Sequence, residues 1–228
     1  MAKSNKLPDV GDDPFFELRI YRVAAGRAAD MEARVQGDLR TLFPKHGIRP
    51  LAGWSTVVSP VSPSFIYLTP WRNMNERSAS WAGFYSDPQW AEVRGRTNAG
   101  SELVESYEIM FVRGITQWGG QAEACAFSEL IIQTCAIGKT VAVTAELKEH
   151  TIPTIAGEGA RVHGVFDMMS GRPLPTLAYL VGWGSLEQRS AAMARLDERS
   201  QAMRAAGNPV LLDRAEQHLM RYLPVDWA

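Results

Sequence analysis

The sequence repeats itself once along its length, and this limits the folds that the chain can adopt. Residues 67–78 read YLTPWRNMNERS and residues 179–190 read YLVGWGSLEQRS, with Tyr, Leu, Trp, Arg and Ser at the same places. The stretch FFELRIYRVAAGR at 15–27 matches FSELIIQTCAIGK at 127–139 in the same register. Self-similarity over such a distance indicates two copies of one structural unit.

The two copies differ in length, and the differences fall where loops are expected. The closing stretch LVESYEIMFVR at 103–113 matches LLDRAEQHLMR at 211–221. The second copy is therefore about four residues shorter, and we place the loss near YSDPQW. We predict four regions along the chain. They are a flexible N-terminal arm (1–14), a first unit (15–113), a linker (114–125) and a second, diverged unit (126–228).

The periodicity of the first unit predicts the order β-α-β-β-α-β. FELRIYRV alternates apolar and polar residues, as a strand does, and residues 28–45 carry apolar side chains at helical spacing. Two strands follow at 51–58 and 64–71, then a helical region from Asn73 interrupted at SDP, and a last strand. This is the ferredoxin-like order. Because each unit leaves one sheet face uncovered, we expect the two to pack sheet to sheet within one chain.

Composition excludes several classes of function. The formal net charge of −1 gives no basic field for nucleic acid or an anionic membrane. Cys125 and Cys135 form no disulfide framework or metal-binding spacing, which fits a reducing, cytoplasmic location. The N-terminus has no apolar signal-peptide core, and no apolar run is long enough to span a membrane. Nucleotide-binding loops, a nucleophile elbow and the HExxH zinc motif are also absent from the sequence.

The first copy resembles the NIPSNAP family of dimeric α/β-barrel proteins. The resemblance rests on ELRIY followed by GR, KHGI with GW, YLTPW with ERS, and LVESYEIMFVR, and it weakens in the second copy. It implies an α+β fold of two ferredoxin-like units forming an intramolecular dimeric α/β barrel. It implies no single activity, because related barrels include monooxygenases, isomerases, lyases, dehydratases and heme binders.

Three residues of the first copy are candidates for catalysis. Arg19 and Tyr21 share a strand face with Glu17, and we expect the barrel to hide that face between its two sheets. A buried Arg19 paired with a carboxylate forms a structural ion pair or stabilises an enolate. His46 is a candidate general base, although a cation in the last turn of a helix also has a structural role.

Aromatic residues gather in the first copy and are candidates for a ligand pocket, although aromatic side chains more often fill a core. The predicted substrate-binding residues are Trp54, Tyr67, Trp71, Trp81, Tyr107 and, from the second copy, His163. Arg19, Tyr21, Trp54 and Trp81 are replaced in the second copy by Ile131, Gln133, Val165 and Met193. We therefore expect function where the copies differ, and the first copy to be the better candidate.

Residues retained in both copies are better explained by the scaffold. Arg77 and Arg189 occupy equivalent places, as do Glu17 and Glu129. We predict that each arginine anchors the second helical region of its unit, to a strand carboxylate or a carbonyl group. The repeated YLTPWRNMNERS stretch then identifies the fold and its duplication, and the function lies elsewhere.

The sequence therefore predicts a NIPSNAP-type enzyme that acts on a small apolar or aromatic metabolite. We expect cofactor-independent acid–base chemistry, as in an isomerase, a C–C lyase or a cofactor-free monooxygenase, with no metal. The alternatives are a protein that binds heme or another flat hydrophobe, with His46, His163 or His218 as the axial ligand, and an interaction scaffold. We expect a small-molecule partner, no nucleic acid or membrane, and a monomeric pseudo-dimer or a homodimer.

Overall fold

The computed structural model describes residues 11, 13–206 and 212–227, so most of the predicted N-terminal arm lies outside the described residues. The first unit contains β1 (Phe15–Val23), α1 (Ala28–Arg34), a π-helical turn, α2 (Arg40–Lys45), β2 (Ala52–Val58), β3 (Ser64–Trp71), α3 (Met74–Ser86), α4 (Pro88–Thr97) and β4 (Val104–Gly114). The second contains β5 (Phe127–Cys135), α5 (Thr140–Glu146), a π-helical turn, α6 (Ile152–Gly157), β6 (Arg161–Ser170), β7 (Thr176–Trp183), α7 (Leu186–Ala205) and β8 (Leu212–Tyr222). This order confirms the predicted β-α-β-β-α-β pattern in both copies.

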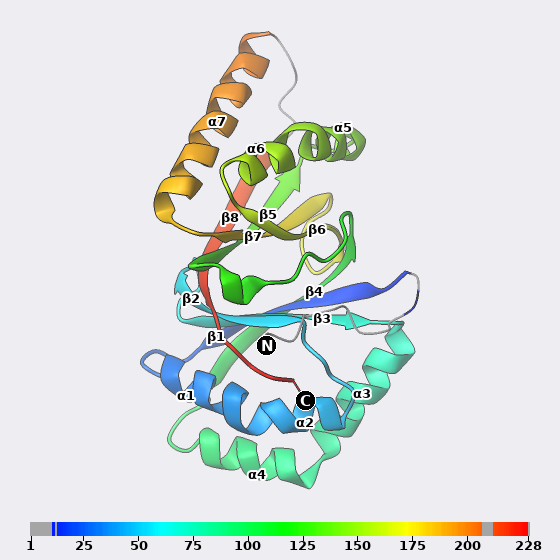
Figure 1. The fold of residues 1–228 in the computed structure, drawn as a ribbon. Coiled ribbons are helices and arrows are strands. Elements are labelled where there is room, and N and C mark those ends of the chain that lie inside the picture. Colours follow the sequence, from blue (N-terminus) through cyan, green and yellow to red (C-terminus); the bar gives the residue numbers. More distant parts are fainter. Residues whose placement is uncertain (1–10, 12, 207–211, 228) are drawn as a thin grey trace.

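The strands of the two units close into one barrel. Their order around it is β1-β3-β2-β8-β5-β7-β6-β4, and β2–β8 and β4–β6 are the antiparallel pairs that join the units. Figure 1 shows the two sheets at the centre, with the helices of the first unit below and those of the second above. The predicted intramolecular dimeric α/β barrel is confirmed.

The interior of the barrel is apolar, and every strand contributes to it. One cluster of buried residues contains Leu18, Trp54, Leu68, Met110, Leu130, Phe166, Leu180 and Met220, one from each strand. On β1 the residues that face the interior are Phe16, Leu18 and Ile20. Because side chains alternate along a strand, the neighbouring positions 17, 19 and 21 face outward, toward the helices. The expectation that Arg19 lies between the two sheets was therefore wrong.

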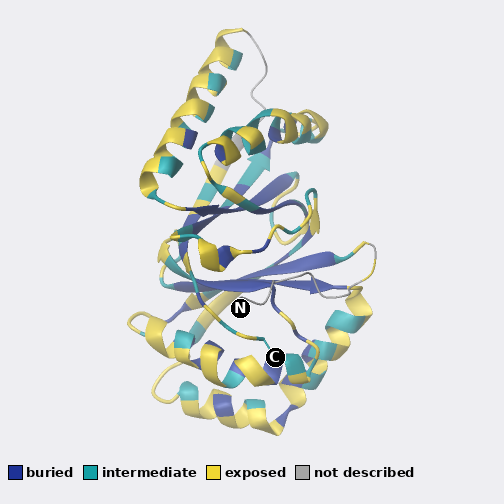
Figure 2. Ribbon diagram, in the orientation of Figure 1, coloured by how far each residue is buried: buried dark blue, intermediate teal, exposed yellow. Residues whose placement is uncertain are grey.

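Each unit forms a second core between its sheet and its helices. Figure 2 shows the strands buried and the outer faces of the helices exposed. The helix ends have the predicted signals, because Gly47 follows α2 with a positive φ of 74° and the Asn73 side chain caps α3. The predicted interruption at SDP separates α3 from α4, whereas α7 runs unbroken for 20 residues in the shorter copy. None of the described helices is both long and apolar enough to cross a membrane.

The chain ends by crossing from the second unit back to the first. The Leu223 amide donates to the carbonyl oxygen of Gly53, and the ring of Trp227 stacks on Phe43 with centroids 5.8 Å apart. In Figure 1 the C-terminus accordingly lies beside α2. The C-terminal segment therefore packs against the first unit, on the side of its sheet that carries the helices.

Candidate functional site

Both units contain the same buried anchor, built on a glutamate of the first strand. Arg77 donates to the two carboxylate oxygens of Glu17 at 3.1 and 2.8 Å, and Arg189 donates to those of Glu129 at 2.9 and 2.6 Å. The tryptophan that ends the third strand donates to the same carboxylate in each unit, at 2.8 Å from Trp71. The prediction that Arg77 and Arg189 tie the helix to a strand carboxylate is confirmed.

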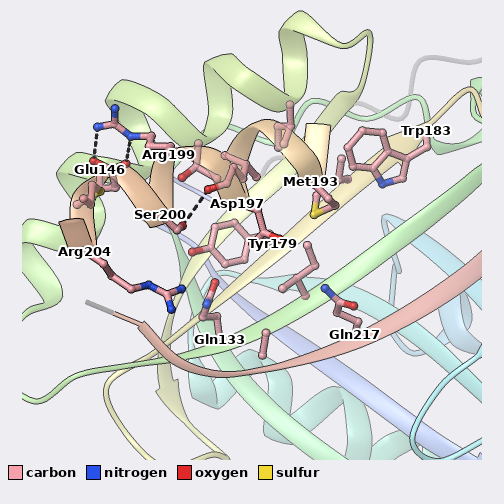
Figure 3. Close-up of a pocket in the computed structure, with 17 residues that line it drawn as sticks. Gln133, Glu146, Tyr179, Trp183, Met193, Asp197, Arg199, Ser200, Arg204 and Gln217 are labelled. Carbon is pink, nitrogen blue, oxygen red and sulfur yellow. Dashed lines mark hydrogen bonds and ion pairs between the residues drawn. The ribbon is translucent and has the colours of Figure 1, made fainter. Parts of the chain in front are cut away.

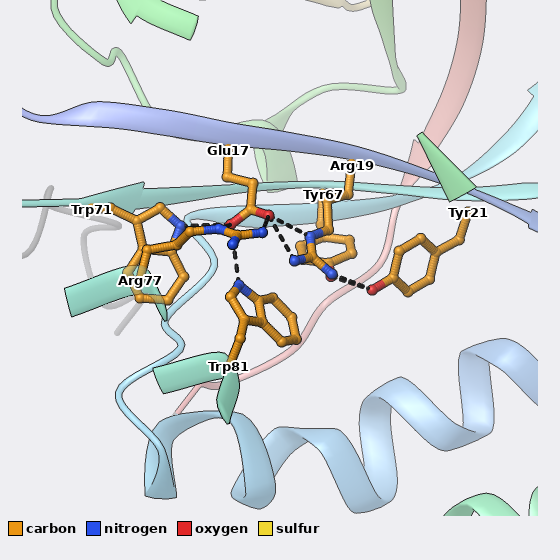
Figure 4. Close-up of polar contacts among 7 residues, drawn as sticks. All are labelled: Glu17, Arg19, Tyr21, Tyr67, Trp71, Arg77 and Trp81. Atoms are coloured by element: carbon orange, nitrogen blue, oxygen red, sulfur yellow. Dashed lines mark hydrogen bonds and ion pairs between the residues drawn. The ribbon is translucent and has the colours of Figure 1, made fainter. Parts of the chain in front are cut away.

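In the first unit, additional polar side chains fill the space beside this anchor (Figure 4). Arg19 is 1% exposed, and its Nε lies 2.8 Å from Glu17 Oε1. Its Nη1 donates to the Tyr21 hydroxyl at 2.9 Å, and the Tyr67 hydroxyl donates to the same oxygen at 2.8 Å. The guanidinium carbon lies 3.6 Å from the ring centroid of Trp81. These contacts place Arg19 in a buried ion pair with Glu17, beside Tyr21 and Trp81.

The pKa values in this cluster follow from burial and from the two arginines. Burial disfavours the charge of Glu17, but the hydrogen bond from Arg77 and the charges of Arg19 and Arg77 lower its pKa below the usual value. Burial raises the pKa of Tyr21 and of Tyr67, against the opposing charge of Arg19. Both phenols therefore stay protonated near neutral pH.

The remaining predicted site residues are distributed over other parts of the molecule. His46 follows α2, and its Nε2 lies 2.7 Å from Asp87, the N-cap of α4. Trp54 is fully buried inside the barrel, and its indole nitrogen has no hydrogen-bond partner among the described residues. His163 is also fully buried, with Nδ1 2.9 Å from the Gly120 carbonyl oxygen. Tyr107 lies at the rim of the Arg19 cluster, 59% exposed, with its ring 5.7 Å from that of Tyr21.

The structure thus brings Arg19, Tyr21, Tyr67, Trp71 and Trp81 together and leaves His46, Trp54 and His163 elsewhere. The five residues form a filled cluster, because Arg19 and Tyr67 are 1% exposed and Trp81 is 4% exposed. Whether any of them touches a substrate stays a prediction.

An open cavity of about 420 Å³ lies in the second unit, between the outer face of its sheet and α5, α6 and α7. This volume is within the range of small-molecule sites. The apolar part of its lining includes Ile131, Ile155, Tyr179, Val181, Trp183, Met193, Leu196 and Met203. The polar part includes Gln133, Glu146, Asp197, Arg199, Ser200, Arg204 and Gln217. Figure 3 shows side chains that line this space, labelled on β5, α5, β7, α7 and β8.

The strand registers show why this space is open in one unit and filled in the other. Arg19 pairs with Tyr67, and Ile131 pairs with Tyr179 in the same way. Tyr21 pairs with Tyr107, whereas its counterpart Gln133 pairs with Ala215. On the helix, Trp81 and Met193 each lie eight residues after the N-cap residue. The second unit keeps the tyrosine of the third strand. At the other equivalent positions it has the smaller side chain in place of Arg19, Tyr21, Tyr107 and Trp81.

One polar group in the cavity has lost its partners through these substitutions. Tyr179 is 5% exposed, and its hydroxyl forms no hydrogen bond to any residue that the structure describes. Burial raises the pKa of this phenol, so it remains a hydrogen-bond donor near neutral pH. Arg199 donates to Glu146 at the wall of the cavity and lowers the pKa of that carboxyl group, so this pair is neutral overall.

The sequence reasoning missed the cavity and its residues, Gln133, Tyr179, Met193, Arg204 and Ala215 among them. The replacements of Tyr21 and Trp81 were visible in the repeat, but we interpreted them as the loss of a pocket. Smaller side chains on an unchanged frame leave space instead, because the paired strands and the anchor hold the backbone in place. The open cavity lies beside the second anchor, whereas a filled cluster lies beside the first, and which unit holds the working site stays a prediction.

The closed barrel of paired ferredoxin-like units places the protein in the dimeric α/β-barrel class. The family model named NIPSNAP matches residues 16–113 and 128–227, so the chain belongs to the NIPSNAP family. No curated protein matches the sequence.

Solved structures support the fold assignment across the full length. A variant of chlorite dismutase from Candidatus Nitrospira defluvii aligns with a TM-score of 0.59 and 9% identity, over 96% of this chain and 95% of that one. A "putative monooxygenase" from Lactobacillus acidophilus aligns with a TM-score of 0.55 and 10% identity, over 93% of this chain and 95% of that one. A NIPSNAP domain protein from Burkholderia xenovorans is 20% identical over 42% of this chain and 90% of its own, with a TM-score of 0.35. At these identities the likeness concerns the fold alone.

Proposed function

We propose that the protein is a NIPSNAP-type enzyme that binds a small, mainly apolar or aromatic molecule in the cavity of the second unit. One observation carries the proposal: the cavity has a largely apolar lining and contains the hydroxyl of Tyr179, which bonds to no residue that the structure describes. A ligand that accepts a hydrogen bond from this hydroxyl gains about 0.5–1.5 kcal/mol. The cavity is therefore suited to an apolar body that carries one polar atom.

The side chains at the cavity support proton transfer without a cofactor. Tyr179 is placed to hold the oxygen of a carbonyl group, and Asp197 supplies a carboxylate that forms no ion pair with the described residues. A proton taken from the carbon beside the carbonyl group would move to Asp197, and the enolate oxygen would remain bound to Tyr179. Returning the proton to another carbon completes an isomerisation. Cofactor-free oxygenation begins from the same enolate with O2 as the oxidant, whereas carbon–carbon cleavage by a retro-aldol step ends at such an enolate, held by Tyr179 in the same way.

The heme alternative fits this cavity less well, because its predicted axial ligands lie elsewhere. His46 is bonded to Asp87 and His163 to the carbonyl oxygen of Gly120. Both ring nitrogens of His218 lie near partners, 2.8 Å from Ser59 Oγ and 2.8 Å from Glu216. None of the three lines the cavity. The residues present do not fit a histidine-ligated heme there, and the structure describes no cluster of metal-binding side chains.

Ligand-induced stabilisation tests the binding site. One- and two-ring aromatic compounds should raise the melting temperature of the purified protein, and the stabilisation should grow with the logarithm of the ligand concentration once the site is mostly occupied. The matched control is Gln133→Tyr/Ala215→Tyr, which introduces at the second unit the tyrosines that stand at the equivalent places of the first, Tyr21 within the cluster and Tyr107 at its rim. This variant should fold normally and lose the shift. Equal shifts in both proteins would overturn the assignment of the site.

Turnover tests the enzymatic part of the proposal. Compounds that bind should be incubated with the protein in air and under argon, and the products identified by mass spectrometry. We expect a product that the Gln133→Tyr/Ala215→Tyr variant does not form. For Asp197→Asn we expect a rate of product formation at least tenfold lower. Binding without any product would reject the enzyme and retain a hydrophobic-ligand-binding protein.

A further inference from the structure

We propose that the ligand of the second-unit cavity is a phenol, a hydroxylated aromatic ring that is bound through its oxygen as the phenolate. This inference rests on the proposed function, because it specifies the ligand class of the same cavity. It is drawn from the first unit, where a phenol belonging to the chain itself occupies the equivalent place.

The first unit shows how this frame accommodates a phenol. Tyr67 donates its hydroxyl hydrogen to the Tyr21 oxygen at 2.8 Å, and the two rings meet edge to face at 89° with centroids 5.3 Å apart. The same oxygen accepts a second hydrogen bond, from Arg19 Nη1 at 2.9 Å. A ring, a tyrosine donor and an arginine donor therefore form one recognition unit.

The second unit retains the tyrosine donor and lacks the ring. Tyr179 occupies the place of Tyr67, and Gln133 replaces Tyr21. Ala215 replaces Tyr107, whose ring lies beside that of Tyr21 in the first unit. Within the part of the chain that the structure describes, the Tyr179 hydroxyl and the Gln133 amide have no side-chain hydrogen-bond partner. A ring entering the cavity would replace Tyr21, and its oxygen would accept the hydrogen bond of Tyr179.

A cation also faces this position, although it comes from a different element. Arg204 lies near the end of α7 and lines the cavity, and it forms no ion pair with the described residues. Arg204, Gln133 and Tyr179 all line the cavity, and Figure 3 draws the guanidinium, the amide and the hydroxyl end of the tyrosine on the same side of the view. Trp183 and Met193 lie at the other side, where they would contact the apolar part of the ligand. A donor beside a cation favours an ionised oxygen. In the first unit burial outweighs the charge of Arg19 and raises the pKa of Tyr21, whereas the cavity of the second unit is open, so burial opposes the charge of a bound oxygen less there.

The probe for this proposal is 4-nitrophenol, because its neutral and ionised forms absorb at different wavelengths. At a pH where the free probe is mostly neutral, adding the protein should raise the phenolate absorbance, since binding lowers the apparent pKa of the probe. Tyr179→Phe should weaken binding about tenfold or more, the loss of a hydrogen bond to a charged oxygen. Arg204→Met should reduce the phenolate absorbance of the bound probe. Tyr85→Phe, an exposed tyrosine of the first unit, is the matched control and should change neither result.

The methyl ether 4-nitroanisole separates this inference from the proposed function. It has the same ring and nitro group but no ionisable hydroxyl, so we expect it to bind at least tenfold more weakly than 4-nitrophenol. Equal affinity for both compounds, lost in Gln133→Tyr/Ala215→Tyr, would overturn phenol recognition and leave the apolar site intact. Absence of binding by either compound would count against both proposals. Tight binding of 4-nitrophenol in its neutral form would overturn the phenolate part.

Discussion

The two units hold the same anchor and differ in what stands beside it. Glu17 with Arg77, and Glu129 with Arg189, join the strand to the helix in the same geometry. Beside the first anchor the chain places its own arginine and phenol, and beside the second it places smaller side chains and leaves a cavity. The comparison teaches that one shared anchor can hold its strand and helix together both beside a filled cluster and beside an open cavity.

The largest expected difference concerns the anchors themselves. Glu17 pairs with two arginines, and one of them, Arg19, is 1% exposed. Glu129 pairs with Arg189 alone among the described residues, and the Arg189 side chain is 21% exposed. Breaking a buried ion pair costs about 3–5 kcal/mol, so Glu17→Gln should lower the free energy of unfolding by about that amount. Glu129→Gln should cost less, because water can reach Arg189. Equal losses of unfolding free energy in urea would show that the two anchors contribute equally to stability.

Packing around the anchors should differ next. Trp81 is 4% exposed, stacks on Arg19 and donates to Glu17, so Trp81→Ala should destabilise the protein by about 3–5 kcal/mol. Met193 already borders open space, so Met193→Ala should cost at most about 2 kcal/mol. Chemical denaturation of both variants checks the difference. A Met193 variant as unstable as the Trp81 variant would mean that the second unit is as tightly filled as the first.

Acid should weaken the first unit through its buried carboxylate. The folded-state pKa of Glu17 is lowered, so its ion pairs stabilise the fold above the unfolded-state pKa of about 4.3. That stability is lost as the pH falls from there through the folded-state pKa. Urea unfolding between pH 6 and pH 3 should therefore show a shallower pH dependence in Glu17→Gln than in the wild type. Parallel curves would contradict the lowered pKa.

The smallest expected effect separates the two equivalent tyrosines. Tyr67→Phe removes the hydrogen bond to Tyr21 and should cost about 0.5–1.5 kcal/mol. Tyr179→Phe removes a hydroxyl that has no partner among the described residues, so the ligand-free protein should lose almost nothing or gain slightly. Thermal unfolding of the two variants measures both values. A clear loss in Tyr179→Phe would reveal a partner for its hydroxyl within the protein.

Much of the fold could be predicted from the sequence because the repeat specifies it. The matching stretches around Tyr67 and Tyr179 fix the same element order twice, and two sheets with one bare face each close against one another. The scaffold role of Arg77 and Arg189 also followed, since both copies retain them beside a glutamate.

Neither the orientation of Arg19 nor the position of the cavity could be predicted, for two physical reasons. Strand alternation separates Arg19 from Leu18 but does not say which of the two faces enters the barrel. The apolar residues Phe16, Leu18 and Ile20 fill the barrel, so Arg19 on the opposite face points toward the helices. The second reason is that the loss of large side chains predicts either collapse or a cavity. Only the described packing around Met193 and Ala215 shows that the frame did not collapse.

A crystal structure of the protein soaked with 4-nitrophenol tests the central claim most directly. The account predicts the ring in the second unit, between α7 and the outer face of its sheet, with its oxygen within hydrogen-bonding distance of Tyr179. The cluster of Arg19, Tyr21 and Tyr67 should remain unchanged. An empty cavity in the second unit, with the ring bound instead against Tyr21 and Tyr107, would contradict the claim that the unfilled copy holds the site.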